Sequence, residues 1–333
     1  MWKNFTLITA LATLSFIPQS IQGIPFKVFE NDRLDASVDA LLVQRKGIRK
    51  KTLALDLTQA SPCNCIEGSV INSTELMNRF RWEPGVKAAI CYTPSVLRSV
   101  EFSVAWVAEW HSHLVRSADN TLRFPFSTTD FTQDYNFAWR AKATYSSQIW
   151  DFEGNYWRHV TPRGEDFFSV SAIAGLRGFY LGEHARLQYS TPPDTSDYKA
   201  HVKNRLCGIQ GGICLQMNPG SHGLWSFELI PKAAILANWV NASSWLGDVN
   251  NTVVVRSSEK MKIREAYLLD GDLRLSYHPH HGFGHIGYRM IGVWNVDLAP
   301  NQFSRKTNFD EASKIRNWRA FYHIIYLGFD WVF

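Results

Sequence analysis

Hydrophobic and polar residues alternate along most of the chain after Gly23. In residues 101–110 nearly every second position carries a large apolar side chain, and residues 168–180 and 267–277 repeat the pattern. A period of two residues, rather than 3.6, is typical of β-strands with one apolar face. The pattern therefore predicts an all-β protein.

We predict about ten strands from this alternation. They cover residues 34–45, 76–93, 99–112, 143–159, 167–182, 199–217, 223–238, 262–278, 283–297 and 318–333. Most are longer than the roughly 5–6 residues usual in globular proteins, whereas a strand that crosses a membrane needs about 9–11. The number rises to twelve if residues 52–58 and part of 113–142 also pair.

The predicted connections alternate in length. Those after the second, fourth, sixth and eighth strands are short. The long ones follow the odd strands, at residues 46–75, 113–142, 183–198, 239–261 and 298–317. Because tight turns at one end and long loops at the other are typical of outer-membrane barrels, we predict an antiparallel up-and-down transmembrane β-barrel with short periplasmic turns and long outer loops.

The N-terminus has the features of a secretory signal in the right order. Lys3 precedes an apolar run from Phe5 to Ile17 that is too short to span a bilayer, and Pro18 follows it. We predict a signal peptide at residues 1–23 and a barrel domain at residues 24–333. No later segment is long and apolar enough for a membrane-spanning helix, so the sequence predicts export to the outer membrane as a barrel.

Aromatic residues gather at the ends of the predicted apolar faces, where Trp and Tyr would meet lipid headgroups. The predicted girdle consists of Trp110, Trp225, Tyr277, Trp294, Trp331 and Phe333. The chain end resembles the C-terminal assembly signal of bacterial outer-membrane barrels, which is a glycine followed by alternating aromatics. That signal comprises Gly328, Phe329, Trp331 and Phe333. We therefore expect outer-membrane lipid and the barrel assembly machinery as partners.

The opposite face of the predicted strands collects charges of both signs. The side chains that we expect to line the lumen are Asp35, Asp39, Arg79, Arg81, Glu83, Lys87, Asp151, Glu153, Arg177, Glu228, Lys232, Asp270, Asp272, Arg274, Arg289 and Asp330. A barrel of ten to twelve strands is intermediate between a filled interior and an open channel. The mixed charges can therefore either line a permeation path or neutralise one another as a plug.

Four segments together resemble one family of known proteins. They are Leu34 to Arg45, Trp82-Glu83-Pro84-Gly85-Val86, Ala174 to Leu181, and Ile286-Gly287-Tyr288-Arg289 with Trp294-Asn295-Val296. They are similar to the porin-like outer-membrane β-barrel proteins of planctomycetes and related chlamydial lineages. The resemblance implies a barrel fold, an outer-membrane location and a porin-like role, and it implies no catalytic residues.

Composition and residue spacing exclude several other classes of function. Hydrophobic residues make up 45% of the chain, which excludes disorder, and a net charge of +5 is too mild to indicate nucleic-acid binding. The histidine-rich segment His278-Pro279-His280-His281 with His285 fits no strong zinc pattern. Carboxylates and histidines that could act at an outer rim carry no diagnostic spacing: Asp130, Asp134, His111 and His113. We therefore predict no catalytic, cofactor or metal site.

Five cysteines leave at least one thiol without a partner inside the chain. Cys63 and Cys65 share a predicted outer loop and could form a disulfide or cross-link neighbouring chains. Cys91 and Cys214 point inward on strands too far apart for a bond, and Cys207 is the fifth.

Three functions stay open at this point. The first, which we rank narrowly ahead because the family resemblance implies it, is a porin-like passive channel for small solutes, and it needs an open lumen. The second is a structural or surface-display barrel with a lumen plugged by charged side chains, alone or as a homo-oligomer. The third, an outer-membrane hydrolase with its site at the rim, has no recognisable motif to support it, and we predict that the protein is not an enzyme.

Overall fold

Alternating side chains build almost the whole structure from strands. The computed structural model describes residues 33–47, 50–56, 69–125, 137–161, 167–219, 224–247, 254–278, 283–303 and 318–333. Its strands are β1 (Arg33–Lys46), β2 (Thr52–Asp56), β3 (Ser69–Asn72), β4 (Glu83–Ser95), β5 (Arg98–Val107), β6 (Trp110–Arg123), β7 (Ala138–His159), β8 (Phe168–Thr191), β9 (Asp194–Met217), β10 (Trp225–Gly247), β11 (Val254–Tyr277), β12 (Phe283–Val296) and β13 (Trp318–Val332). Two short helices, α2 (Ser73–Asn78) and η5 (Ala299–Gln302), accompany them.

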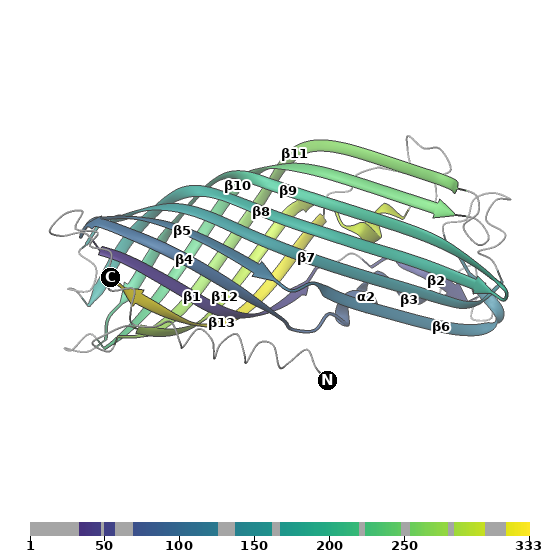
Figure 1. Cartoon of the computed structure of the whole chain (residues 1–333), viewed down its shortest axis with the longest axis horizontal. Helices are drawn as coiled ribbons and strands as arrows, with labels where there is room; N and C mark the ends of the chain where they lie inside the picture. Colours follow the sequence, from purple (N-terminus) through teal and green to yellow (C-terminus); the bar gives the residue numbers. More distant parts are fainter. Residues whose placement is uncertain are drawn as a thin grey trace, which may run out of the picture. The chain divides into compact units, whose positions relative to one another are not determined.

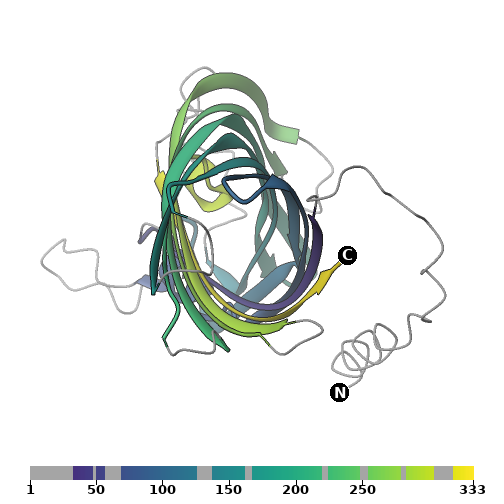
Figure 2. The ribbon, with the colours of Figure 1, turned by 90° about the vertical axis from the view of Figure 1, so that its left-hand side faces the viewer.

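Ten strands close into one antiparallel ring. Around the ring the order is β7, β5, β4, β1, β13, β12, β11, β10, β9 and β8, and β8 pairs again with β7. Figure 2 shows these strands curving around a common axis. The predicted antiparallel barrel of about ten strands is therefore confirmed.

The outer face of the ring is an apolar band. Leu176, Ile209 and Ile235 are paired neighbours on β8, β9 and β10, and they are 63%, 65% and 60% exposed. Aromatic residues border this band on both sides. We call the row on the side of the β8–β9 connection at Pro192-Pro193 the upper row and the row on the other side the lower row. The upper aromatic row consists of Trp106, Trp150, Tyr180, Trp239, Tyr267 and Trp294. The lower aromatic row consists of Tyr92, Phe168, Trp225, Tyr277, Phe329 and Trp331. Such a band matches the outer surface of membrane barrels.

Half of the ring strands extend well beyond the others. β7 to β11 are 22 to 24 residues long, whereas the remaining ring strands have 10 to 15 residues. In Figure 1 the long strands continue to the right, where β6 joins them by pairing with β7. We call this part, beyond the upper aromatic row, the extended end.

An inner cover packs on the inward face of the extended end. It comprises residues 50–56, 69–80 and 297–303, with Leu53, Leu76 and Phe303 buried. Aromatic side chains pack the inner cover against β7, where Phe80 stacks on Tyr145 with 5.0 Å between the centroids of the two aromatic rings. The long strands therefore have a buried inner face even where the shorter strands no longer accompany them.

The strand predicted at residues 76–93 is wrong at its start. Residues Ser73–Asn78 form helix α2, because the side chain of Asn72 accepts a hydrogen bond from the main-chain N–H of Glu75 at 2.8 Å and so caps the first turn. Neither this helix nor the other described helical segment is long and apolar enough to cross a membrane.

Three long loops of the prediction are largely strand. Residues 183–198 extend β8 and β9, which a short turn at Pro192-Pro193 connects. Likewise β6 runs to Arg123 and β10 to Gly247. In these extensions the apolar residues, such as Leu187 and Tyr189, face inward, and most outward residues are polar, which reverses the arrangement on the ring strands.

Trp110 does not belong to the outer girdle. The chain leaves the sheet at Ala108 and Glu109, so the strand predicted at residues 99–112 divides into β5 and β6. This interruption changes which face the following residues occupy. Trp110 is fully buried, and its indole N–H donates to the carbonyl of Val43 at 3.3 Å.

Two glycines on β9 allow a test of the ring's packing. A Cβ atom on Gly208 would lie 2.1 Å from the carbonyl oxygen of Ile235 on β10, whereas one on Gly211 would meet nothing closer than 3.7 Å. We expect Gly208→Ala to lower the free energy of unfolding by about 1–3 kcal/mol, because β9 and β10 must separate to admit the methyl group. Urea unfolding in detergent micelles measures this loss. Gly211→Ala serves as the control and should change stability by less than about 0.5 kcal/mol; equal losses in both variants would contradict the pairing.

Candidate functional site: the crossing of the lumen

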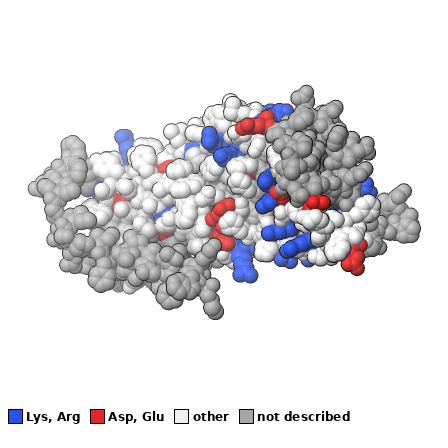
Figure 3. All heavy atoms as spheres, turned by 45° about the vertical axis from the view of Figure 1, so that its right-hand side comes forward, with Lys and Arg blue, Asp and Glu red and all other residues white. Residues whose placement is uncertain are grey.

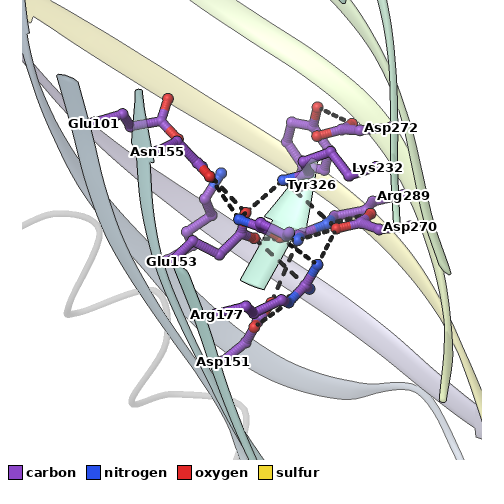
Figure 4. A network of polar contacts seen from close by, with 12 residues as sticks. Glu101, Asp151, Glu153, Asn155, Arg177, Lys232, Asp270, Asp272, Arg289 and Tyr326 are labelled. Carbon is purple, nitrogen blue, oxygen red and sulfur yellow. Dashed lines mark hydrogen bonds and ion pairs between the residues drawn. The ribbon is translucent and has the colours of Figure 1, made fainter. Parts of the chain in front are cut away.

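Six charged side chains meet at mid-height inside the ring. We call them the charge layer: Asp151, Glu153, Arg177, Lys232, Asp270 and Arg289. Each side chain is at most 9% exposed. Three positive and three negative groups leave the layer neutral. Figure 4 shows the side chains converging from several strands onto one point.

Arg177 on β8 organises one side of the layer. Its Nε and Nη2 donate to the two carboxylate oxygens of Asp151 at 2.9 and 2.7 Å. Its Nη1 donates to Asp270 on β11 at 2.8 Å. A planar guanidinium offers donors in a fixed fork, so one arginine can hold two carboxylates in defined positions.

Arg289 on β12 carries the layer across the lumen. Its Nε donates to Asp270 Oδ1 at 2.9 Å, and its Nη2 donates to Glu153 on β7. In the ring of ten strands, β7 and β12 are five steps apart in either direction. This ion pair therefore joins opposite walls of the barrel.

Polar neighbours complete the layer. Lys232 on β10 donates to Glu153 at 2.5 Å, and the amide of Gln210 on β9 donates to Glu153 at 3.1 Å and to Asn155 at 2.5 Å. Six consecutive strands, β7 to β12, thus contribute side chains. Next to the layer is a void of about 20 Å³, lined in part by Asp39, Lys87 and Arg289.

A second crossing lies nearer the extended end. Arg45 on β1 forms a fully buried ion pair with Glu183 on β8, and it donates to the hydroxyl of Tyr145 on β7 at 2.8 Å. The inner cover lies directly against this pair, because the main-chain N–H of Ala299 donates to Glu183 at 2.8 Å. The lumen is thus bridged at two heights.

The segment before η5 is held by polar contacts as well. Asn204 donates to the carbonyl oxygen of Asp297 at 2.8 Å, and Arg264 donates to its carboxylate at 2.8 Å. Burial raises the pKa of the Asp297 carboxyl to about 6, although Arg264 opposes this shift. The segment is therefore fixed to β9 and β11 by contacts with two of the long strands.

A histidine joins two carboxylates near the short-turn end. His285 contacts Asp330 through Nδ1 and Asp39 through Nε2, both at 2.8 Å. Gly328 faces this group, and a Cβ atom there would lie 2.1 Å from Asp39 Oδ1. The glycine of the C-terminal motif is therefore required by packing inside the barrel.

The remaining inward charges of the prediction divide into two groups. Those that lie on ring strands with buried or half-buried side chains are Asp35, Glu83, Lys87, Glu228, Asp272 and Arg274. Tyr326 donates to Asp272 at 2.6 Å, and Lys87 pairs with Asp39 at 3.8 Å. Arg79 and Arg81 are exposed and precede β4, so the structure does not place them in the lumen. Helix α2 occupies the position where their strand was expected, which is the physical reason for this correction.

The predicted aromatic residues other than Trp110 lie on the outer face. Trp225 and Tyr277 contact each other at 4.7 Å between centroids, and Trp294 contacts Phe321. At the chain end, Phe329 and Trp331 pack together at 4.9 Å, and Phe333 is exposed. These residues surround both ends of the apolar band.

Several predicted residues cannot be placed. Those outside the described ranges are residues 1–23, Cys63, Cys65, Asp130, Asp134, His280 and His281. No disulfide joins the three described cysteines, Cys91, Cys207 and Cys214, to one another. Among the described residues, no group of three or more His, Cys, Asp or Glu side chains could hold a metal ion.

Sequence reasoning missed both members of the second crossing. Arg45 ends the first predicted strand, and Glu183 was assigned to a loop. A signal for Glu183 does exist, because it continues the inward positions of β8 after Arg177, Phe179 and Leu181. The partners Asn155 and Gln210 are uncharged and carried no comparable signal.

The comparisons with known proteins are weak. No family model matches the chain, and no curated protein sequence matches it. Among solved structures, the chain is similar to the Escherichia coli outer membrane protease OmpT, with 11% identity, a TM-score of 0.49, and coverage of 91% of this chain and 97% of that one. It is also similar to a Pseudomonas aeruginosa FadL homologue, with 10% identity, a TM-score of 0.23, and coverage of 91% and 90%. These similarities do not establish a family for the chain.

Removing one charged side chain from the charge layer should lower the free energy of unfolding. In Arg289→Met, the carboxylates of Asp270 and Glu153 lose a buried partner, and we expect the free energy of unfolding to fall by about 3–5 kcal/mol. Arg158→Met is the matched control, since Arg158 is exposed on the outer side of β7. Denaturant midpoints in micelles compare the two. Similar midpoints for both variants and the parent would show that the layer does not hold the ring together.

Proposed function

We propose that the protein is an outer-membrane β-barrel with a closed lumen, which anchors the extended end of its sheet at the cell surface. The observation that carries this proposal is the contact of Arg289 with Glu153 between opposite strands of the ring. Buried, paired charges at this point leave little space for a solute. The barrel therefore acts as a rigid base for the long strands β7 to β11.

The distribution of surface side chains supports the membrane placement. The apolar band lies between two aromatic rows, as expected for a lipid-facing surface. Figure 3 shows Lys and Arg side chains gathered in the right-hand half of this face, while the left-hand half is mostly uncharged. In this proposal the short turns and the C-terminus lie in the periplasm, and the extended end lies outside the cell.

A passive channel is the function that the family resemblance implies. It would require both crossings, the charge layer and the Arg45–Glu183 pair, to move aside. Since each contains buried charges, separating them without replacement by water would cost several kcal/mol per ion. We therefore place the closed barrel ahead of the channel, and we propose no catalytic activity.

Planar-bilayer recordings distinguish a closed barrel from a channel. We expect the refolded protein to insert without producing stable conductance steps, because the charge layer occupies the lumen. A variant that opens both crossings, Glu153→Ala with Arg289→Ala and Arg45→Ala with Glu183→Ala, keeps the net charge and should produce steps. Stable, uniform steps from the unaltered protein would overturn the closed-barrel proposal.

Charge scanning of the outer face tests the membrane placement. Leu269 on β11 is 54% exposed within the apolar band, and Trp139 on β7 is 51% exposed at the extended end. We expect Leu269→Arg to destabilise the protein in lipid bilayers by about 2–4 kcal/mol, since the guanidinium would face acyl chains. Trp139→Arg should have little effect. Folding yield and urea stability in liposomes measure the difference, and equal tolerance of both changes would rule out a lipid-facing band.

A further inference from the structure

A hollow on the outward face of the extended end gathers histidines from separate strands. It has a volume of about 750 Å³ and is formed by β6 to β10. The titratable side chains that line it are His111, His113, Lys142, His184, Arg186, Lys199 and His201. The parts of these strands that line the hollow lie beyond the upper aromatic row, so the hollow faces water in the proposed placement.

Two of these histidines are direct neighbours across strands. His184 on β8 lies opposite His201 on β9 in the antiparallel register. Their ring centroids are 3.7 Å apart, with an angle of 68° between the ring planes. Directly opposite side chains on adjacent strands have Cβ atoms about 4.5–5.5 Å apart, so both imidazoles can reach one common point in front of the sheet.

A carboxylate and a third imidazole lie close by. His111 on β6 is followed in the same cross-strand row by Ser146 on β7 and then by His184. Glu109 contacts His111 Nε2 at 3.3 Å, and its negative charge also acts on His184. Because Ser146 is small, it leaves space between the two histidine positions.

The protonation state suits metal coordination. Burial lowers the pKa of His184, and burial together with His184 and Lys203 lowers the pKa of His201 to about 4. Both rings are therefore neutral at neutral pH and have a nitrogen lone pair available. A neutral imidazole is the commonest metal ligand among side chains.

We propose that His184 and His201 form a two-imidazole binding site for a late first-row divalent cation such as Cu²⁺, Ni²⁺ or Zn²⁺. Imidazole nitrogens favour these ions, whereas Mg²⁺ and Ca²⁺ prefer oxygen ligands. Two protein ligands leave the coordination open, and water completes it. The site is independent of whether the lumen is closed.

Titration of the purified, untagged protein in detergent with Cu²⁺, Ni²⁺ and Zn²⁺ tests the site. We expect each of the three ions, titrated separately, to bind with a stoichiometry of one per chain, and Cu²⁺ to bind more tightly than Ni²⁺ or Zn²⁺. His184→Ala and His201→Ala should each weaken binding at least about tenfold, since each removes half of the protein ligands. Lys203→Gln should tighten binding, because a positive charge is removed near the ion.

The matched control is His323→Ala. His323 is also on the outer face of a strand, but it is hydrogen-bonded to Tyr288 at 2.6 Å and lies away from the hollow. We expect unchanged affinity there. Electron paramagnetic resonance of the Cu²⁺-loaded parent protein, which needs no variant to fold, should show coupling to two imidazole nitrogens.

Three results would overturn the proposal. The first is the absence of binding to the parent protein. The second is binding of equal strength to the parent and to the double variant His184→Ala, His201→Ala, which would indicate adventitious sites. The third is a Cu²⁺ spectrum with one nitrogen or none.

Discussion

The pairing of three cations with three carboxylates across the ring is the constraint on which the rest of the structure depends. A ring of about ten strands is intermediate between barrels whose interior is filled by side chains and barrels that leave an aqueous channel, so its inward side chains decide whether the lumen is closed. Arg177 and Arg289 are long enough to reach across and can hold two carboxylates each. Buried charges need such partners, because an unpaired one would be strongly destabilising. The register of every strand from β7 to β12 must therefore place the correct residue inward.

This requirement links the two faces of the barrel. Side chains alternate strictly along a strand, so a shift of one residue in β8 would move Arg177 to the outer face and Leu176 to the lumen. The shift would cost twice, once for an arginine on an apolar surface and once for an unpaired carboxylate inside. The apolar band and the charge layer therefore specify the same register. The inward Gly208 acts in the same direction, since only a glycine allows β9 and β10 to approach at that point.

Much of this could be predicted from the sequence, because alternation reports directly which residues share a face. Asp151, Glu153, Arg177, Asp270 and Arg289 were all expected inside. Their partners could not be predicted, because contacts across the lumen depend on ring closure and on strand order rather than on local spacing. Trp110 was misplaced for a local reason: two residues outside the sheet exchange the faces, and no pattern in the sequence marks them. The extended strands were assigned to loops because their apolar residues face inward and most of their outward residues are polar, so they carry no apolar outer band.

The extended end differs in kind from the ring. Its outer face carries histidines, lysines and arginines, and its inner face is covered by residues 50–56, 69–80 and 297–303 in place of opposite strands. Arg45 and Glu183 lie where the two parts meet, and the inner cover contacts Glu183 through Ala299. The charged contacts inside the ring thus stabilise the fold, whereas the exposed side chains of the extended end are not needed for packing and are available to bind ligands.

Proton exchange at the arginine side chains tests the central claim most directly. The Nε–H groups of Arg177 and Arg289 donate to Asp151 and Asp270, each at 2.9 Å, inside the ring, whereas the Arg158 side chain is exposed. Nitrogen-15 NMR of the protein in micelles resolves these protons. The account predicts that the Nε–H protons of Arg177 and Arg289 exchange with water far more slowly than that of Arg158. Equal exchange rates for all three would mean that water fills the lumen and that no charge layer closes it.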